Sequence, residues 1–243
     1  METSIDMEIY KINILDKSEV LAVSLCQKDE YRELDVERIL SAKELTTYKG
    51  YQHRKKKVDF LLGRSMAKCA IDKLSACENF AEIEITNSVF GAPIVIGDNM
   101  ANLGVSISHS NEYATAVSYH RNFPCAIDTE VIRPKCEKAM RSLLECNEAS
   151  IIKGYNELNI LTVMWTAKEA ASKVLNIGFT VDTKIFEVDK IQKSSDCLIG
   201  SYRYLKGFQF VSQKIGNSIL TVASPIVNNK HMFVEQFKLM SIK

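Results

Sequence analysis

One stretch of predicted helix carries charged residues inside its most apolar part, and this placement constrains the fold more than any other feature. Residues 158–175 contain no Gly or Pro, and their apolar side chains recur at the three-and-four spacing of a helix with one buried face. Lys168 and Glu169 interrupt that apolar face, while Glu169 and Lys173 lie four positions apart and project from one side. The simplest interpretation is an exposed Glu–Lys pair worth a few tenths of a kcal/mol. Other parts of the chain favour the interpretation that these charged residues have a function.

The composition excludes several classes of protein. The 243 residues can form one sizeable domain or two small ones, and the apolar and charged fractions are those of a globular protein. A net charge of +1 gives no electrostatic case for binding nucleic acid or a membrane surface. The seven cysteines contain no Cys-x-x-Cys pair, which argues against a disulfide framework and a zinc site. With no signal-like or membrane-spanning apolar run, the chain is expected to be soluble and cytoplasmic.

The first half of the chain mixes strand and helix patterns. Ser41 can cap a helix, with Glu44 three residues later in the capping-box position. The basic run from His53 to Lys57 precedes a longer helix, where cations oppose the helix dipole and a bound anion would relieve that cost, although such runs are usually solvated helix starts. The expected elements are two strands within 8–25, helices over 33–40, 42–48 and 60–74, strands over 81–86 and 94–96, and a hairpin of 105–110 with 113–119.

A short strand carries the second candidate feature. Within residues 125–131, Asp128 and Glu130 are two positions apart, so their carboxylates point to the same face about 7 Å apart along the backbone. Paired carboxylates of this kind can hold a hard divalent cation. The spacing alone is weak evidence, because Glu82 and Glu84 share it without any assigned chemistry.

The second half continues with helices and then strands, and it repeats the first half weakly. Residues 60–71 align with 164–175 at an offset of 104, with apolar positions on apolar positions and Arg64 on Lys168. Two related α+β halves are the economical explanation. The expected elements are helices over 137–144, from Asn147 and over 158–175, then strands over 185–188, 198–204, 208–211 and 218–223, with 233–240 ambiguous.

Taken together, these motifs resemble those of the Sfp-type 4′-phosphopantetheinyl transferases. The resemblance covers about residues 35–225 and implies an α+β pseudo-dimer of two similar halves with coenzyme A in the cleft between them. We therefore expect an N-terminal half, 1–122, on the side of the coenzyme 3′-phosphate, and a C-terminal half, 123–243, that carries the metal site. The matching segments are Ala126–Glu130 and Trp165–Lys173, supported in the family's order by Phe60–Arg64, Gly91–Pro93 and Ser106–Ser110.

The resemblance also implies roles for individual residues. Asp128, Glu130 and Glu169 would be the ligands of Mg²⁺, with Mn²⁺ as an alternative. Glu169, or a metal-bound water beside it, would take the proton of the attacking serine hydroxyl, and Lys173 would also belong to the catalytic group. The residues expected to contact the phosphates of coenzyme A are Lys56, Arg64, Ser108, His109, Lys168 and Lys173.

The expected activity is that of a 4′-phosphopantetheinyl transferase of the holo-[acyl-carrier-protein] synthase type. It would modify a serine of a carrier protein of fatty acid, polyketide or nonribosomal peptide synthesis, and the enzyme is expected to be a monomer. Two alternatives are a carrier-binding protein without catalysis and a metal-dependent pyrophosphatase that cleaves coenzyme A. Ala92 departs from the basic residue that the family often places between the Gly and the Pro, and Thr129 replaces a commoner aliphatic residue.

Overall fold

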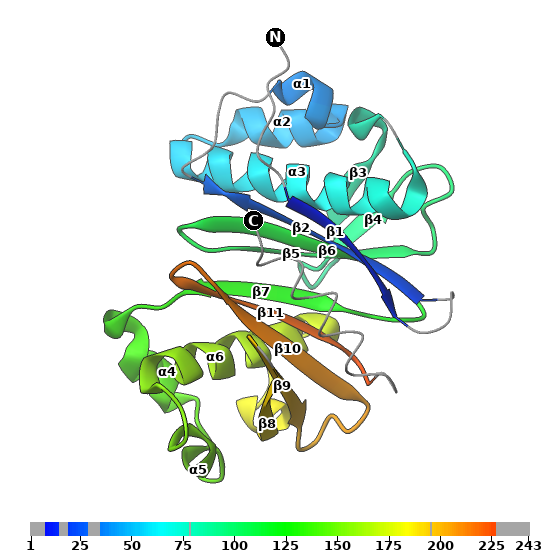
Figure 1. Cartoon of the computed structure of the whole chain (residues 1–243). Coiled ribbons are helices and arrows are strands. Elements are labelled where there is room, and N and C mark those ends of the chain that lie inside the picture. The colour runs from blue at the N-terminus through cyan, green and yellow to red at the C-terminus, as the bar shows by residue number, and fades with distance from the viewer. Residues whose placement is uncertain (1–7, 15–18, 29–34, 78, 195, 227–243) are drawn as a thin grey trace. The chain divides into compact units, whose positions relative to one another are not determined.

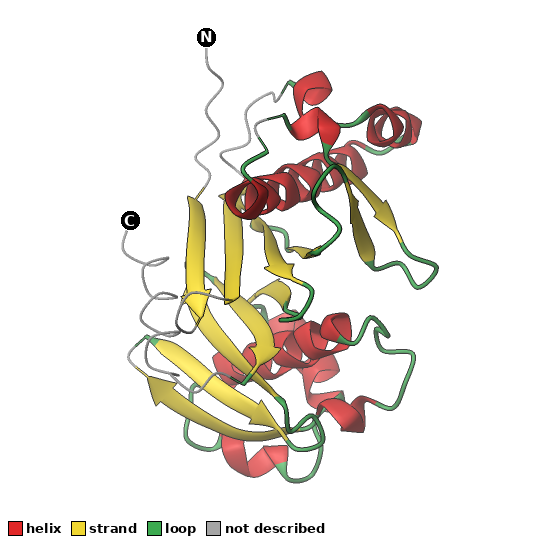
Figure 2. Cartoon of the chain, turned by 90° about the vertical axis from the view of Figure 1, so that its right-hand side faces the viewer, coloured by secondary structure: helices red, strands yellow, loops and turns green. Residues whose placement is uncertain are grey.

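Each half of the chain builds its own antiparallel sheet and packs one long helix against it (Figure 1). In this computed structural model, the described residues are 8–14, 19–28, 35–77, 79–194 and 196–226. The chain separates into two compact units, Met1–Pro124 and Cys125–Lys243. Helices and strands of each unit occupy separate layers (Figure 2), so the expected α+β class is observed.

The first unit contains a four-stranded sheet with the order β1-β2-β6-β5. Two antiparallel hairpins form it, and the pairing of β2 with β6 joins them. A separate two-stranded sheet consists of β3 and β4. The strands are β1 (Glu8–Ile14), β2 (Glu19–Gln27), β3 (Glu84–Asn87), β4 (Pro93–Ile96), β5 (Leu103–His109) and β6 (Tyr113–His120).

The long helix α3 (Arg54–Ser75) covers the sheet of the first unit and contacts β2, β5 and β6. Its apolar face is buried together with side chains of these strands. Gly63 lets the helix approach β5 closely, because a Cβ there would lie 3.2 Å from Ile107. Two shorter helices, α1 (Val36–Ile39) and α2 (Ala42–Gly50), precede it, and the predicted capping box of Ser41 and Glu44 starts α2.

The second unit contains a five-stranded antiparallel sheet with the order β7-β11-β10-β9-β8. The long helix α6 (Glu157–Val174) packs on β7 and β11, and its buried side chains share a core with the sheet. Two short helices, α4 (Glu137–Ser142) and α5 (Glu148–Ile152), precede it. The strands are β7 (Ala126–Val131), β8 (Val188–Ser194), β9 (Cys197–Tyr202), β10 (Phe208–Ile215) and β11 (Ser218–Pro225).

The two units share an order of elements. From β2 and from β7, and leaving aside short 3₁₀ helices, the chain runs through one strand, three α-helices and four strands. In both units the first of these strands pairs antiparallel with the last, and the third helix packs on that pair. The units differ in that β3 and β4 stand apart from the main sheet of the first unit, whereas β8 and β9 extend that of the second. No described helix has both the length and the hydropathy of a membrane-spanning segment.

Two strand predictions are wrong in part, for the same physical reason: the strand expected over 185–188 shares only Val188 with β8, and the strand expected over 81–86 begins only at Glu84. Residues 183–186 form a 3₁₀ helix, so β8 begins only at Val188, and residues 80–82 form another before β3. Each 3₁₀ helix follows a side chain that accepts a backbone hydrogen bond, Asn79 from Ala81 and Asp182 from Lys184. Such local bonds compete with strand pairing. The turn expected near residue 16 and the segment 233–240 lie outside the described residues.

Candidate active site

The strand β7 and the helix α6 bring the central site residues of the second unit together. Asp128 pairs across the sheet with Thr221 of β11. The hydroxyl of Thr221 lies 2.6 Å from that of Thr166 on α6, so this face of the sheet lies directly beneath the helix. Asp128 therefore points towards the helix that carries Glu169 and Lys173, because residues paired across an antiparallel ladder share a face.

Lys173 and Asp128 form a charge-assisted hydrogen bond. The Lys173 ammonium donates to Asp128 Oδ1 at 2.7 Å and to the carbonyl oxygen of Ile127 at 3.2 Å. The Asp128 side chain is 9 % exposed and that of Lys173 is 29 % exposed. The pair is thus only partly open to solvent. Partial burial makes a charge-assisted hydrogen bond stronger than it would be at a fully exposed surface.

Glu169 lies one helical turn before Lys173 and shares its electrostatic environment. Burial raises the pKa of Glu169, the charge of Asp128 raises it further, and Glu130 adds to this, while the ammonium of Lys173 opposes the shift. The charges of Asp128, Glu130 and Lys173 therefore all act on the Glu169 carboxylate. A raised carboxylate pKa favours proton uptake nearer to neutral pH.

Glu130 is held by a residue that the sequence analysis did not select. Its Oε1 accepts hydrogen bonds from Arg133 Nη2 and from the backbone N–H of Val131, both at 2.9 Å. The Nε of Arg133 is buried and has no hydrogen-bond partner in the described part of the chain. The only sequence signal for this contact was the spacing of three residues between Glu130 and Arg133. Such a spacing predicts a side-chain contact on a helix, whereas these residues lie at and after the end of a strand.

The donor set suits a magnesium ion, although the three carboxylates are not gathered around one point. Among the described residues, no group of three His, Cys, Asp or Glu side chains has a geometry that could hold a metal. Lys173 instead provides the positive charge next to Asp128, and Arg133 does so for Glu130. Carboxylate oxygens are the ligands that Mg²⁺ prefers. Burial is the largest cause of the raised pKa of Glu169, and the charges of Asp128 and Glu130, which a cation would offset, add to it.

Lys168 lies in a different environment from Glu169. Its ammonium donates to Glu148 Oε2 at 2.7 Å and to the carbonyl oxygen of Leu143 at 2.8 Å, and its side chain is 1 % exposed. Glu148 also accepts the backbone N–H of Val188. This placement does not favour the expected contact of Lys168 with coenzyme phosphates, because Glu148 already neutralises the charge of the Lys168 ammonium inside the unit.

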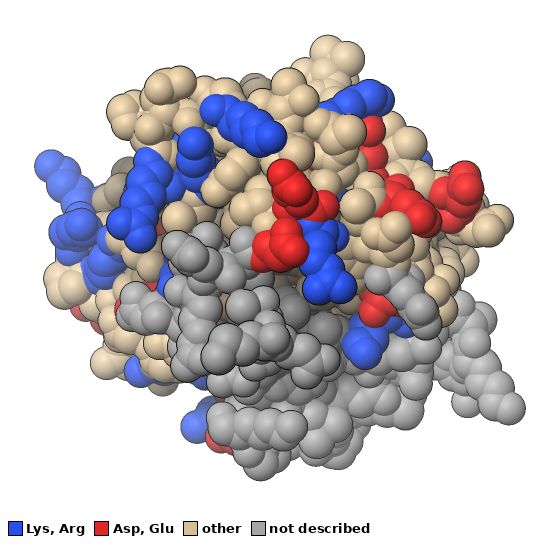
Figure 3. All heavy atoms as spheres, turned by 90° about the horizontal axis from the view of Figure 1, so that it is seen from above, with Lys and Arg blue, Asp and Glu red and all other residues tan. Residues whose placement is uncertain are grey.

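The remaining predicted coenzyme residues belong to the first unit. Lys56 is exposed in the first turn of α3, and Lys and Arg side chains gather over the start of this helix (Figure 3). Ser108 is buried and His109 exposed at the end of β5. The hydroxyl of Ser110 accepts two backbone N–H groups in the turn after β5, which fixes the predicted hairpin.

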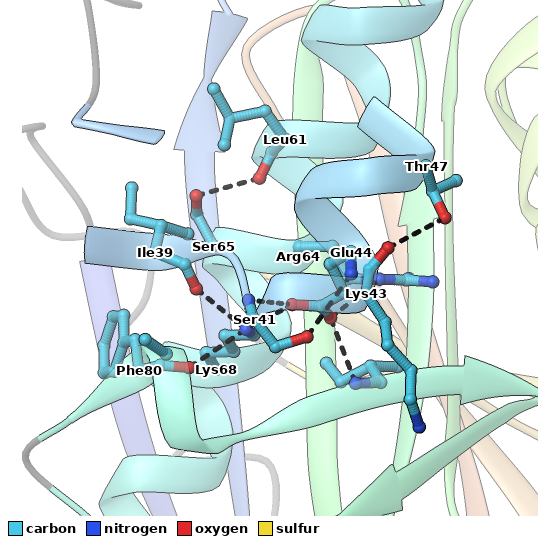
Figure 4. Close-up of polar contacts among 12 residues, drawn as sticks. Ile39, Ser41, Lys43, Glu44, Thr47, Leu61, Arg64, Ser65, Lys68 and Phe80 are labelled. Carbon is cyan, nitrogen blue, oxygen red and sulfur yellow. Dashed lines mark hydrogen bonds and ion pairs between the residues drawn. The ribbon is translucent and has the colours of Figure 1, made fainter. Parts of the chain in front are cut away.

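Arg64 takes part in a buried network centred on Glu44 (Figure 4). Its Nε lies 3.3 Å from Glu44 Oε1, without the alignment of a hydrogen bond, and its guanidinium lies 4.8 Å from the centre of the Phe60 ring. Burial lowers the pKa of Arg64, and the charge of Glu44 opposes this. Lys68 binds the second oxygen of Glu44 at 2.5 Å, so two cations share one carboxylate. A further anion near Arg64 would balance that charge.

Glu169→Gln is expected to raise the melting temperature of the metal-free protein at neutral pH. Burial and Asp128 raise the folded-state pKa of Glu169 above its unfolded value, so stability is lost as the pH rises through the raised pKa. Glutamine removes that loss, and the gain should vanish below the ordinary value of 4.5, where both states are protonated. Thermal unfolding of both proteins in a chelator, near neutral pH and near pH 4, measures the difference.

The matched control is Glu84→Gln, because Glu84 is paired with Lys43 on the first unit rather than with other carboxylates. This variant should gain no stability at neutral pH. An equal gain for Glu169→Gln at both pH values would contradict the electrostatic explanation.

The family model that matches this chain lies within the second unit, apart from its first residue. The family model described as the 4′-phosphopantetheinyl transferase superfamily matches residues 124–223. A holo-[acyl-carrier-protein] synthase of Streptococcus agalactiae is 35% identical over 107 residues, which cover 42% of this chain and 88% of the relative. The synthase of Ligilactobacillus salivarius is 36% identical over 110 residues, covering 42% and 79%.

A solved structure of a Bacillus anthracis holo-(acyl-carrier-protein) synthase, in complex with CoA (3′,5′-ADP), is also similar to the chain. The two are 28% identical, and the match covers 41% of this chain and 93% of that chain, with a TM-score of 0.38. The curated relatives thus match along most of their length to about two fifths of this chain.

Proposed function

This chain belongs to the 4′-phosphopantetheinyl transferase superfamily, and on this premise we propose that it transfers 4′-phosphopantetheine from coenzyme A to a serine of an apo carrier protein. The products are the holo carrier protein and 3′,5′-ADP. The observation that carries the proposal is the group formed by Asp128, Glu169 and Lys173, in which burial and neighbouring carboxylates raise the pKa of Glu169. The family model covers all three residues.

Asp128, Glu130 and Glu169 would hold the Mg²⁺ ion, which would neutralise charge on the pyrophosphate of the coenzyme. Glu169 takes the proton of the serine hydroxyl, and its raised pKa suits it to act as a base near neutral pH. The serine oxygen forms a bond to the phosphorus that carries pantetheine, while the bond from that phosphorus to 3′,5′-ADP breaks. Lys173 stabilises the negative charge of the leaving group from its place beside Asp128.

The proposed contacts with the coenzyme in the first unit are those of Lys56, Arg64, Ser108 and His109. Arg64 and Lys68 share one carboxylate, which supports an anion-binding role for Arg64. That the two halves form a pseudo-dimer with the coenzyme in the cleft between them remains part of this proposal, and the shared order of elements supports the relation of the halves.

The proposal is tested by incubating the protein with coenzyme A, Mg²⁺ and a panel of apo carrier proteins, followed by mass spectrometry of each carrier. A phosphopantetheine adduct on the carrier serine is expected, together with one 3′,5′-ADP per adduct. Cleavage of coenzyme A without an adduct would establish a hydrolase instead. Binding of a carrier without either product would indicate a non-catalytic member of the fold.

Reversing two charges after the acidic strand should slow docking of the carrier without changing the affinity for coenzyme A. Lys135 and Lys138 are exposed, and they lie with Arg141 and Lys153 in the segment that follows β7. Arg141 already pairs with Glu137 and Glu157, so the two lysines are the better choice for reversal. Carrier proteins are generally acidic, and steering by a basic surface raises the association rate more than the affinity.

The measurement is the salt dependence of the association rate for Lys135→Glu/Lys138→Glu. A slower rate with a flatter salt dependence is expected, since fewer attractive charges remain to be screened. An unchanged salt dependence would place the docking surface elsewhere.

A further inference from the structure

Lys168 and Glu148 form a buried ion pair that ties three elements of the second unit together. The ammonium on α6 bonds Glu148 Oε2 at the start of α5 and the carbonyl oxygen of Leu143 after α4. The other carboxylate oxygen, Glu148 Oε1, accepts the backbone N–H of Val188 in β8 at 2.7 Å. Oε2 also accepts the backbone N–H of Glu145 at 2.7 Å. Glu148 is 0 % exposed and Lys168 1 %.

The first unit contains the same arrangement at Lys68 and Glu44 (Figure 4). The Lys68 ammonium on α3 bonds Glu44 Oε2 at 2.5 Å and two backbone carbonyl oxygens, of Ile39 and Phe80. Glu44 Oε1 accepts the backbone N–H of Ile85 in β3, and Oε2 accepts that of Ser41. In both units, a lysine of the third helix therefore binds a glutamate at the start of the second. The same glutamate also accepts two backbone N–H groups. One belongs to the region of a strand that follows the third helix, and the other belongs to the residue three positions before the glutamate.

In the first unit, the lysine–glutamate pair occurs without a counterpart of the acidic residue Glu169. Glu169 follows Lys168, whereas Cys69 follows Lys68, so the lysine–glutamate pair persists where the carboxylate on the helix is absent. A lysine ammonium has three donors, and Lys68 uses all three within its own unit. The pair is thus built for the packing of each unit, and its formation does not depend on a phosphate ligand.

From these contacts we infer that Lys168 is a positioning residue that fixes α6, through Glu148, so that Glu169 and Lys173 face Asp128, and that it makes no contact with coenzyme A. Lys168 and Glu169 are adjacent, so a rotation or shift of α6 that follows loss of the pair moves Glu169 directly. Misplacement of a reacting group by about 1 Å can reduce the rate by about two orders of magnitude. For its kinetic part, this inference depends on the proposed transferase activity.

The test compares Lys168→Met with the double variant Lys168→Met/Glu148→Gln in the full chain. The single variant leaves a buried carboxylate without its cation and should lower the melting temperature by about 10 °C. Its turnover per folded molecule, assayed well below that temperature, should fall roughly tenfold, with the KM for coenzyme A within about twofold of wild type. The double variant, with a neutral pair, should recover at least half of both losses.

Lys173→Met is the matched control, because Lys173 is proposed to contact the phosphates. Glu148→Gln should rescue neither its activity nor its KM for coenzyme A. The inference is overturned if both Lys168 variants show a KM for coenzyme A raised about tenfold or more, as loss of a phosphate contact would produce. It is overturned too if the double variant is no more stable than the single one. The melting temperatures test the ion pair even if the wild type transfers nothing, in which case only the proposed function fails.

Discussion

Asp128→Ala and Glu169→Gln are each expected to abolish phosphopantetheine transfer while leaving the fold intact. Both substitutions remove a carboxylate from a group that is proposed to hold Mg²⁺ and to accept the serine proton, and neither creates a large cavity. Loss of one charged group at a reacting centre typically costs about two to three orders of magnitude in rate, so a reduction of roughly a thousandfold is expected. The measurement is the rate of holo carrier formation over a range of Mg²⁺ concentrations.

Thr129→Val is the control for this experiment. Thr129 lies on β7 between the two acidic residues, and alternation along the strand turns its side chain to the opposite face. Its transfer rate per folded molecule should stay close to that of wild type. Full activity of Asp128→Ala at low Mg²⁺ would refute the assignment of Asp128 as a ligand.

The helix and the strand that carry this site could be predicted from the sequence because both have strong local patterns. Apolar residues at helical spacing predicted residues 158–175, and α6 spans Glu157–Val174. Alternation predicted 125–131, and β7 spans Ala126–Val131. Because strand alternation fixes which residues share a face, the common orientation of Asp128 and Glu130 followed as well.

The partners of the charged residues could not be predicted, because they depend on contacts between distant segments. Glu148 lies 20 positions before Lys168, and Glu44 lies 24 before Lys68. The capping box identified Glu44 as a local acceptor, but no periodic pattern indicates which lysine reaches it. The pairing of Glu130 with Arg133 was missed for a different reason, because a spacing of three residues indicates a side-chain contact on a helix but not after a strand.

The sequence suggested an internal repeat, and the alignment that it suggested differs by one helical turn from the alignment that the ion pairs favour. The contacts match Lys68 with Lys168, an offset of 100, whereas the sequence comparison placed Arg64 on Lys168 at an offset of 104. Four residues are close to the 3.6 residues of one turn, so the apolar faces of the two helices stay in phase under either alignment. Apolar periodicity therefore cannot distinguish them, while a buried ion pair can.

Arg64→Ala should weaken the use of coenzyme A by roughly 10- to 150-fold, the loss of a charge-assisted hydrogen bond of about 1.5 to 3 kcal/mol. A guanidinium can bind a phosphate through two parallel hydrogen bonds, which a lysine ammonium does not reproduce. The fold should survive, because Glu44 keeps its bonds to Lys68 and to the backbone N–H groups of Ser41 and Ile85. The effect on catalysis can therefore be separated from an effect on stability.

Dephospho-coenzyme A, which lacks the 3′-phosphate, identifies the group that Arg64 binds. It should be a poor substrate for the wild type. In Arg64→Ala, its catalytic efficiency should fall much less than that of coenzyme A, so that removing the 3′-phosphate and removing the Arg64 side chain have non-additive effects. Lys43→Ala is the control, because Lys43 is an exposed cation of the same unit that pairs with Glu84, and its removal should leave the ratio of the two substrates unchanged. Catalytic efficiencies of the three proteins with both substrates complete the cycle. Equal losses for the two substrates in Arg64→Ala would mean that Arg64 serves only the network around Glu44.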